Sequence, residues 1–287
     1  METFRRYLSL IKFSHTVFAL PFALIGFTLA IHTGRASFSG MKLLLVLLCM
    51  VFARSAAMAF NRFIDRRFDA SNPRTSVREI PAGLISPQAA LAMVLFCCAA
   101  FIICTWFINA LCFYLSPVAL LVILGYSYTK RFTPLCHLVL GVGLSLAPIG
   151  AYMALTERFD VLPLIFSMVV FLWVSGFDII YALQDDEFDR SQNLKSIPVW
   201  LGRRAALRLS TLLHLVASLA VAAAFIVGSF GWLYLLGALV FVGLLIYQHA
   251  LVKPDDLSRV NLAFGTLNGV ASVIFCVFVC SDIFFLS

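Results

Sequence analysis

Charged residues are scarce in this chain. They make up 12% of its 287 residues, whereas 62% are hydrophobic, and the mean hydropathy is +0.99. Soluble domains carry about 25% charged residues, so this composition excludes a soluble protein and predicts an all-α polytopic membrane protein. No polar linker is long enough to divide the chain, and we therefore expect a single transmembrane domain over residues 1–287.

Metal-binding cysteine motifs are also missing. None of the eight cysteines stands in a CxxC pair or at a zinc-ligand spacing from histidine, and nearly all lie in apolar runs. Cysteine in such runs behaves as a small buried hydrophobe. The formal net charge of +7 does not indicate nucleic-acid binding, because the basic residues cluster between the apolar runs. We expect no nucleic-acid partner and no obligate protein partner.

Apolar runs recur along the whole chain. A helix needs about 20 apolar residues to cross the hydrocarbon core of a membrane. We predict nine transmembrane helices, bundled around a central cavity, near residues 13–33, 40–60, 88–108, 110–128, 134–155, 160–182, 206–228, 230–251 and 264–285. The break between the third and fourth helices is the weakest, because Asn109 is nearly its only polar residue.

Lysine and arginine are divided unevenly between the two sides of this arrangement. Only Arg35, Lys42 and Arg158 fall in loops on one side, Arg54 falls within the second span, and all the others lie on the side of the N-terminus. Positive residues concentrate in cytoplasmic loops. We therefore expect an integral protein, of the bacterial inner membrane, with its N-terminus and its active site on the cytoplasmic side.

Two acidic clusters follow the second and sixth predicted spans, and both fall on the cytoplasmic side. Residues four apart share a helix face. The polar residues in this register are Asn61, Asp65 and Asp69 after the second span, and Asp178, Asp185 and Asp189 around the end of the sixth. Carboxylates near a membrane are costly and are functional candidates by default.

Hard oxygen ligands on facing helices suit Mg²⁺, which usually takes one or two carboxylates together with phosphate oxygens of a substrate. We predict that Asp65, Asp69, Asp185 and Asp189 hold Mg²⁺ around a diphosphate. The two long polar loops, 70–87 and 190–205, lie over these residues. Long loops in compact proteins often act as lids, and we expect both loops to cover the site.

Basic and aromatic residues accompany the acids. Arg54 lies two turns before Asn61 and within the bilayer, where an unpaired cation is costly, so it must meet an acid or an anionic ligand. Lys130 lies one turn after Tyr126 at the end of the fourth span, and both could reach a diphosphate. The histidines at 137 and 214 are interpreted as ordinary buried residues.

With these residues in view, the chain resembles the UbiA superfamily of membrane prenyltransferases. The two motifs of that family, NxxxDxxxD and DxxxD with an upstream Asp, match the two clusters, and a Tyr-x-x-x-Lys-Arg element matches residues 126–131. Residues 13–16, 72–75 and 196–198 are most similar to a 4-hydroxybenzoate polyprenyltransferase-like subgroup, which includes menaquinone enzymes of the futalosine route. One departure is Arg62, which stands where many members have Asp.

The resemblance implies Mg²⁺-dependent transfer of a polyprenyl group from a polyprenyl diphosphate to the ring of a hydroxylated aromatic acid, with release of diphosphate. The acceptor implied is of the 4-hydroxybenzoate type or 1,4-dihydroxy-6-naphthoate, in ubiquinone or menaquinone biosynthesis. Membrane lipid surrounds the protein. The residues to which we assign catalytic roles are Asp65, Asp185, Arg54 and Lys130. The candidate substrate-binding residues are Asn61, Arg67, Arg74, Tyr126, Arg131, Tyr181, Gln184, Asp178 and His15.

Three alternatives stay open at this point. A secondary transporter would carry its acids near the middle of the membrane in broken helices, whereas these lie at helix ends. An enzyme that transfers a phospho-alcohol from a nucleotide-linked lipid would carry an Asp-Gly-x-x-Ala-Arg element, which this sequence lacks. A sibling prenyltransferase with a haem, chlorophyllide or lipid acceptor would share the same motifs.

Overall fold

The protein is described here by a computed structural model that covers residues 6, 7, 9–11 and 18–286. This part of the chain is built from helices joined by turns. The elements are α2 (Leu20–His32), α3 (Gly40–Ser71), α4 (Pro87–Ile108), α5 (Ala110–Thr129), α6 (Cys136–Thr156), α7 (Val161–Ala182), η2 (Leu183–Asp185), α8 (Asp186–Ser191), α9 (Ile197–Leu201), α10 (Arg203–Gly228), α11 (Trp232–Leu251), η3 (Leu262–Leu267) and α12 (Asn268–Phe285).

Eight helices in the described residues are long and apolar enough to cross a membrane, and they correspond to the second to ninth predicted spans. The first predicted span is represented by α2, which has 13 residues and is by itself shorter than the about 20 needed to span a bilayer. The expected start of that span at residue 13 lies outside the described residues.

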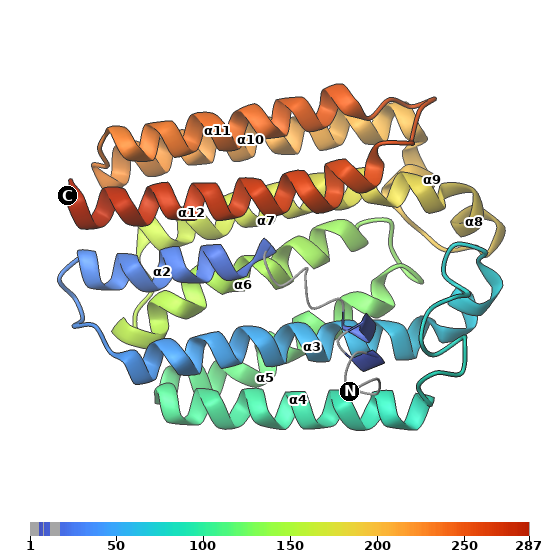
Figure 1. The fold of residues 1–287 in the computed structure, drawn as a ribbon, viewed down its shortest axis with the longest axis horizontal. Coiled ribbons are helices and arrows are strands. Elements are labelled where there is room, and N and C mark those ends of the chain that lie inside the picture. Colours follow the sequence, from blue (N-terminus) through green and yellow to red (C-terminus); the bar gives the residue numbers. More distant parts are fainter. Residues whose placement is uncertain (1–5, 8, 12–17, 287) are drawn as a thin grey trace.

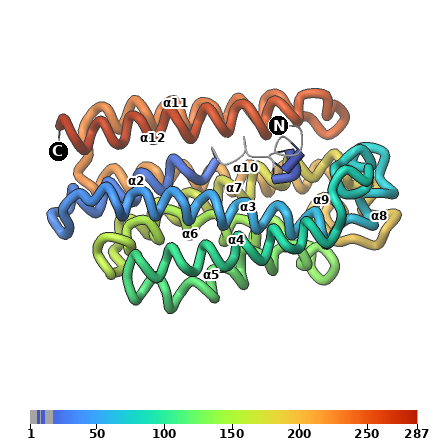
Figure 2. Tube along the Cα trace, turned by 60° about the horizontal axis from the view of Figure 1, so that its bottom comes forward, coloured from blue at the N-terminus to red at the C-terminus, as the bar shows by residue number. Residues whose placement is uncertain are grey.

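The long helices run side by side along one direction (Figure 1). Both views place α11 and α12 on one side of the bundle and α4 and α5 on the opposite side (Figures 1 and 2). Helix α7 belongs to the most enclosed segment, Val161–Ser191. Of the most apolar stretch of this segment, 67% of the residues are buried, compared with 22% for α5. A side chain on α7 is therefore surrounded by protein, and the end of this helix is a rigid place from which to present a functional group.

Aromatic rings fill the half of the bundle formed by α2, α7, α11 and α12. Phe22 lies 5.4 Å from Trp173, which lies 5.6 Å from Phe241, and Phe241 lies 5.0 Å from Phe275, measured between ring centroids. All four side chains are fully buried. Offset and edge-to-face contacts of this kind add to the free energy gained from burial, so this half is solidly packed.

Helical structure continues beyond two of the predicted apolar spans. We expected a span at 40–60, but α3 continues without a break to Ser71 and measures 32 residues. It ends where Asn72 takes an extended conformation before Pro73, because a residue that precedes proline is disfavoured in a helix. The predicted end of the sixth span at 182 is likewise followed directly by η2 and α8. Asp65 and Asp69 therefore lie on a helical extension of the second span, and Asp185 and Asp189 on the short helices that follow the sixth.

The weak break at Asn109 is a true helix boundary. The Asn109 side chain accepts a hydrogen bond from the Cys112 amide at 2.8 Å and so caps α5. Its Nδ2 donates to the carbonyl oxygens of Met153 and Ala154 on α6. A single polar residue therefore both begins a helix and fastens it to a neighbour.

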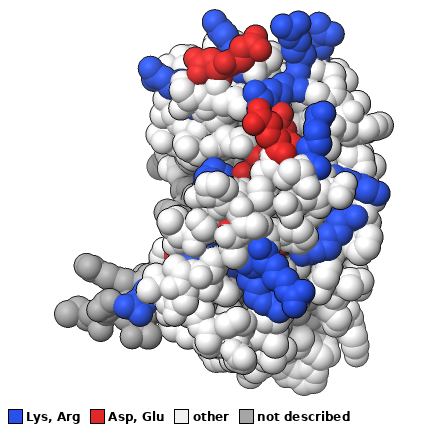
Figure 3. All heavy atoms as spheres, turned by 90° about the vertical axis from the view of Figure 1, so that its right-hand side faces the viewer, with Lys and Arg blue, Asp and Glu red and all other residues white. Residues whose placement is uncertain are grey.

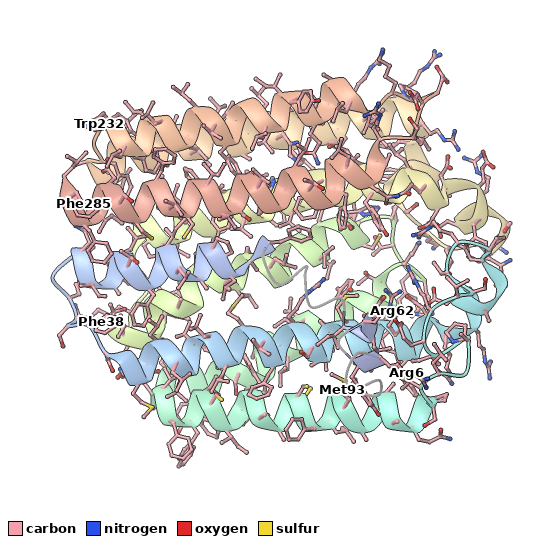
Figure 4. The ribbon with its side chains drawn as sticks, viewed as in Figure 1. Arg6, Phe38, Arg62, Met93, Trp232 and Phe285 are labelled. Carbon is pink, nitrogen blue, oxygen red and sulfur yellow. The ribbon has the colours of Figure 1, made fainter. Side chains whose placement is uncertain are left out.

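The two ends of the bundle differ in character. Phe38, Trp232 and Phe285 lie at one end and Arg62 lies towards the other (Figure 4). Seen from that other end, lysines, arginines and acidic residues gather on the surface (Figure 3). We call this the charged end.

Candidate active site

The two acidic clusters line one cavity at the charged end. The cavity has a volume of about 530 Å³ and is lined by α3, α7, η2 and α8, the α5–α6 connection and residues of loop 72–79. Asn61 and the five aspartates of the two motifs are all among the lining residues. Helices far apart in the sequence therefore present both motifs to the same space.

In the first cluster, each carboxylate has a basic partner from another segment. Arg131 Nη2 lies 2.8 Å from Asp65 Oδ1, and Arg78 Nη1 lies 2.7 Å from Asp69 Oδ1. Asn61 Nδ2 donates to Asp65 Oδ2 at 3.0 Å, which orients that carboxylate along the face of α3.

The second cluster is arranged in the same way. Lys130 Nζ lies 2.6 Å from Asp189 Oδ1, and the guanidinium of Arg74 makes two hydrogen bonds to the Asp185 carboxylate. Arg74 Nη1 also donates to the hydroxyl of Tyr181 at 3.2 Å. Each of the four candidate metal ligands is thus paired with a lysine or arginine. A bound anion could pair with these cations in place of the carboxylates.

Charges in the cavity lining balance one another. Its acidic residues are Asp65, Asp69, Glu79, Asp178, Asp185 and Asp189, and its lysines and arginines are Arg54, Arg62, Arg74, Arg78, Lys130 and Arg131. An anionic ligand that brings its own divalent cations would keep this balance, because the acids could turn to the metal and the bases to the ligand.

Two basic residues outside the membrane-spanning segments, Lys130 and Arg74, are held in their charged form. Burial alone would lower the pKa of Lys130, but the adjacent Asp189 carboxylate raises it above its usual value. Burial likewise opposes the charge on Arg74, and its hydrogen bonds to Asp185 raise the pKa of its guanidinium. Both side chains therefore offer a full positive charge at neutral pH.

The donor set suits a hard cation held jointly with a substrate. Among the described residues, no three His, Cys, Asp or Glu side chains come close enough to form a metal site alone. The Oδ2 atoms of Asp69 and Asp189 are buried without a hydrogen-bond donor. Oxygen atoms in this state are available to Mg²⁺, which needs only one or two carboxylates when phosphate oxygens and water complete its shell.

Arg54 lies where the charged cavity meets a second, apolar chamber. That chamber has a volume of about 350 Å³ and is lined mainly by aliphatic residues of α3, α5 and α6; Arg54 and Tyr126 line both spaces. The Nε of Arg54 is buried without a hydrogen-bond acceptor. Of the two partners expected from the sequence, an acid within ion-pair distance is absent from the described residues, which leaves an anionic ligand.

Asp178 has a partner that the sequence interpretation missed. His137 Nδ1 lies 2.7 Å from Asp178 Oδ2, and the backbone N–H of Ile197 donates to His137 Nε2 at 3.4 Å. Since Nε2 accepts, Nδ1 carries the proton that is donated to Asp178. His137 thus lines the site and is no ordinary core histidine. The sequence around His137 gave no sign of this role, because its partner Asp178 lies 41 residues away in the chain.

Phe264, which forms an aromatic wall with the predicted residue Tyr181, was also missed. Phe264 stacks on Tyr181 with ring centroids 4.1 Å apart, and both line the cavity. Phe264 belongs to η3, a π-helix. Such wide turns often occur at functional sites, but the local sequence gave no sign of one.

Two predicted substrate-binding residues, Arg67 and Gln184, do not line the cavity. Arg67 is exposed and lines a separate surface groove with Gln192. Gln184 donates to the carbonyl oxygen of Tyr181 and is absent from the lining. Arg67 lies on the outer side of α3, and Gln184 lies in the turn of η2 that carries Asp185 inward. His15 falls outside the described residues.

Comparison with known proteins places this geometry in a family. The model of the UbiA prenyltransferase family matches residues 19–277. The chain is 32% identical over 235 residues to the 4-hydroxybenzoate octaprenyltransferase of Aliivibrio salmonicida, covering 81% of each chain. It is 30% identical over 254 residues to the enzyme of the same name from Tolumonas auensis, covering 86% of each.

Solved structures agree in fold. The apo structure of a UbiA homologue from Aeropyrum pernix K1 has a TM-score of 0.81 and 29% identity, covering 94% of this chain and 97% of that one. A UbiA homologue from Archaeoglobus fulgidus bound to GPP and Mg²⁺ has a TM-score of 0.70 at 21% identity, covering 97% and 99%. With paired aspartate motifs around one cavity in a membrane-embedded helical bundle, the chain belongs to the UbiA prenyltransferase family and is a prenyltransferase.

Proposed function

We propose that this protein transfers a polyprenyl group from a polyprenyl diphosphate to the ring of a hydroxylated aromatic acid in quinone biosynthesis, with Mg²⁺ as the cofactor. The observation that carries the proposal is the joining of two unlike spaces at Arg54 and Tyr126. One space is lined by paired acids and bases, and the other is almost wholly apolar. A substrate with a diphosphate head and a hydrocarbon tail requires this combination.

The charged cavity suits the diphosphate. Asp65, Asp69, Asp185 and Asp189 would hold Mg²⁺, which supplies positive charge to the leaving diphosphate when bound. Lys130 and Arg74, released from their carboxylates, would donate to the phosphate oxygens. Charge that is preorganised around a leaving group lowers the barrier to its departure.

The apolar chamber suits the prenyl tail. Its lining runs from Arg54 to Phe159 in the α6–α7 connection, and it includes Val118, whose side chain is 58% exposed. The chamber therefore reaches the surface of the bundle. A tail too long for a volume of about 350 Å³ would continue into the surrounding lipid.

Arg54 suits the carboxylate of the acceptor. A buried guanidinium with a free N–H gains most from a carboxylate, which it can bind through two parallel hydrogen bonds. A carboxylate bound there would hold the aromatic ring at the mouth of the apolar chamber, beside the first carbon atoms of the donor tail. Acceptors without an acid group, such as a neutral lipid, would leave Arg54 without a partner.

The reaction then follows from these positions. The allylic C–O bond breaks and its electron pair leaves with the diphosphate; a ring carbon of the acceptor forms the new C–C bond, and the ring loses a proton. Asp178 faces the cavity and has a histidine partner in place of a lysine or arginine, so we assign it the role of accepting this proton. The aromatic faces of Phe264 and Tyr181 can stabilise positive charge that develops on the allyl group.

The distribution of basic residues supports a cytoplasmic position for the charged end. This orientation and the inner membrane of a bacterium are part of the proposal. Substituted-cysteine labelling in intact cells and in inverted vesicles would test the orientation. We expect an exposed residue of the charged end, such as Val77, to be labelled as cysteine only in inverted vesicles.

One assay tests the reaction. Membranes that carry the protein are incubated with Mg²⁺, a polyprenyl diphosphate and a panel that contains 4-hydroxybenzoate, 1,4-dihydroxy-6-naphthoate, haem and a glycerol phosphate, and the lipid extract is examined by mass spectrometry. We expect a prenylated aromatic acid, and the panel identifies which of the two. Prenylation of haem or of the glycerol lipid alone would contradict the proposal.

A further inference from the structure

Arg62 lies in the charged cavity in a state that its protein partners do not explain. Its side chain is 5% exposed, and the residue stands on α3 directly after Asn61 and lines the cavity. Its Nε is buried without a hydrogen-bond acceptor. A basic residue that served only to anchor the helix at the membrane surface would be exposed, as Arg67 is.

Asp69 does not account for Arg62 either. Among the described residues, the ion pair of Arg62 is with Asp69 alone, and the distance from Nη1 to Oδ2 is 3.9 Å, which is too long for a hydrogen bond. Asp69 is already bound by Arg78 at 2.7 Å. A buried guanidinium is costly unless its donors are satisfied. Asp69 and Glu79 act on Arg62 only through longer-range attraction, and its Nε has no acceptor among the described residues.

The position of Arg62 indicates which anion it meets. Arg54, two turns earlier, lines both the charged cavity and the apolar chamber, whereas Arg62 lines the charged cavity only. Arg62 also lies beside Asp69, which has a free Oδ2. A ligand at this point is therefore part of the head of the donor, and no part of the acceptor or the tail.

We propose that Arg62 binds the diphosphate directly and supplies positive charge that would otherwise have to come from a divalent cation. The inference rests on the proposed function, because it takes the diphosphate as the occupant of the cavity. Its consequence is that the protein binds a diphosphate with less Mg²⁺ than its four aspartates alone would require. Arg62 thereby tunes the metal requirement of the site.

Calorimetry with inorganic diphosphate tests this in the purified full-length protein in detergent, over Mg²⁺ concentrations from chelator to saturation. We expect Arg62→Ala to weaken binding in chelator by about 10- to 100-fold, the range for a hydrogen bond to a charged group, and by less at saturating Mg²⁺. Arg62→Lys keeps the charge and should recover part of the loss.

Arg66→Ala is the matched control, because Arg66 lies one turn later on the same helix, over the Phe63 ring at 4.6 Å, and does not line the cavity. It should bind as the unchanged protein does. Equal affinities of Arg62→Ala and the unchanged protein at every Mg²⁺ concentration would overturn the inference, including when the variant melts at a lower temperature. If the unchanged protein binds no diphosphate even with Mg²⁺, the proposed function falls as well.

Discussion

Two segments close the charged end of the bundle, and the first is held by side-chain charges. Loop 72–86 is attached through the ion pairs of Arg74 with Asp185 and of Arg78 with Asp69. Its outer side faces solvent, with Val77 77% exposed. Its anchors are the same carboxylates that we propose as metal ligands.

The second segment, 192–202, is held by its backbone. Lys195 N donates to Lys130 O at 2.7 Å, and Ile197 N donates to His137 Nε2. Ser196 and Ile197 are fully buried. None of these bonds uses a motif aspartate, so a ligand in the cavity has no reason to break them.

The difference shows that length and polarity alone do not make a lid. We expected both loops to cover the site as lids, but only the attachments of loop 72–86 compete with a metal–diphosphate ligand for the same carboxylates. We therefore expect loop 72–86 to respond to ligand and segment 192–202 to act as a fixed wall that positions Lys130 and His137.

The largest expected effect comes from removing the shared anchor. Asp185→Ala deprives loop 72–86 of its partner for Arg74 and removes a proposed metal ligand. We expect prenyl transfer to fall by about three orders of magnitude, as for other losses of electrostatic stabilisation, with the protein still in the membrane. Product formation in membranes with matched protein content measures it.

Glu187→Ala is the control for this variant, since Glu187 is a largely exposed carboxylate in α8, the helix that directly follows Asp185. Its transfer rate should stay near that of the unchanged protein. Full activity of Asp185→Ala and of Asp65→Ala, maintained in chelator, would remove the basis for the metal assignment.

Lys130→Ala should have the next largest effect. Lys130 is held in place by segment 192–202 through its carbonyl and presents its Nζ to the cavity. We expect about a 100-fold loss of kcat/KM, with the donor affected more than the acceptor, because the charge faces the diphosphate. Steady-state kinetics with each substrate varied in turn measures the split. A loss confined to acceptor KM would place Lys130 elsewhere in the mechanism.

Hydrogen exchange compares the two segments directly. On addition of Mg²⁺ and inorganic diphosphate, we expect backbone amide exchange to change several-fold in residues 74–84, because their ion pairs with Asp69 and Asp185 are replaced, and to stay constant in residues 195–201. Mass spectrometry of peptides from the full protein measures both. Equal changes in both segments, or a change in the second alone, would contradict the distinction.

The smallest expected effect is on stability. Ser196 Oγ accepts a hydrogen bond from Val199 N and caps α9, so Ser196→Ala should cost about 1 kcal/mol and lower the melting temperature by a few degrees. Ser76 in loop 72–86 caps no helix, so Ser76→Ala should lower the melting temperature less. Thermal unfolding of the purified protein in detergent compares the two; a larger loss at Ser76 would reverse our view of which segment is structural.

Local pattern alone determined much of this protein. The apolar runs predicted all eight helices of spanning length in the described residues. Membrane insertion depends on about 20 consecutive apolar residues and not on distant partners. The spacing of Asn61, Asp65 and Asp69 placed these side chains on one face, because helix periodicity is a property of the segment itself. The two aspartate motifs could therefore be recognised from the sequence before the fold was known.

Only the tertiary structure decided which charged side chains of the site pair with one another. Arg74 meets Asp185 across 111 residues, and His137 meets Asp178 across 41. The wide turn of η3 and the junction at Arg54 likewise depend on neighbours that no sequence window contains. Partners of buried charges are chosen by packing and desolvation between distant segments. This is why one polar loop is attached through side-chain ion pairs and the other through backbone hydrogen bonds.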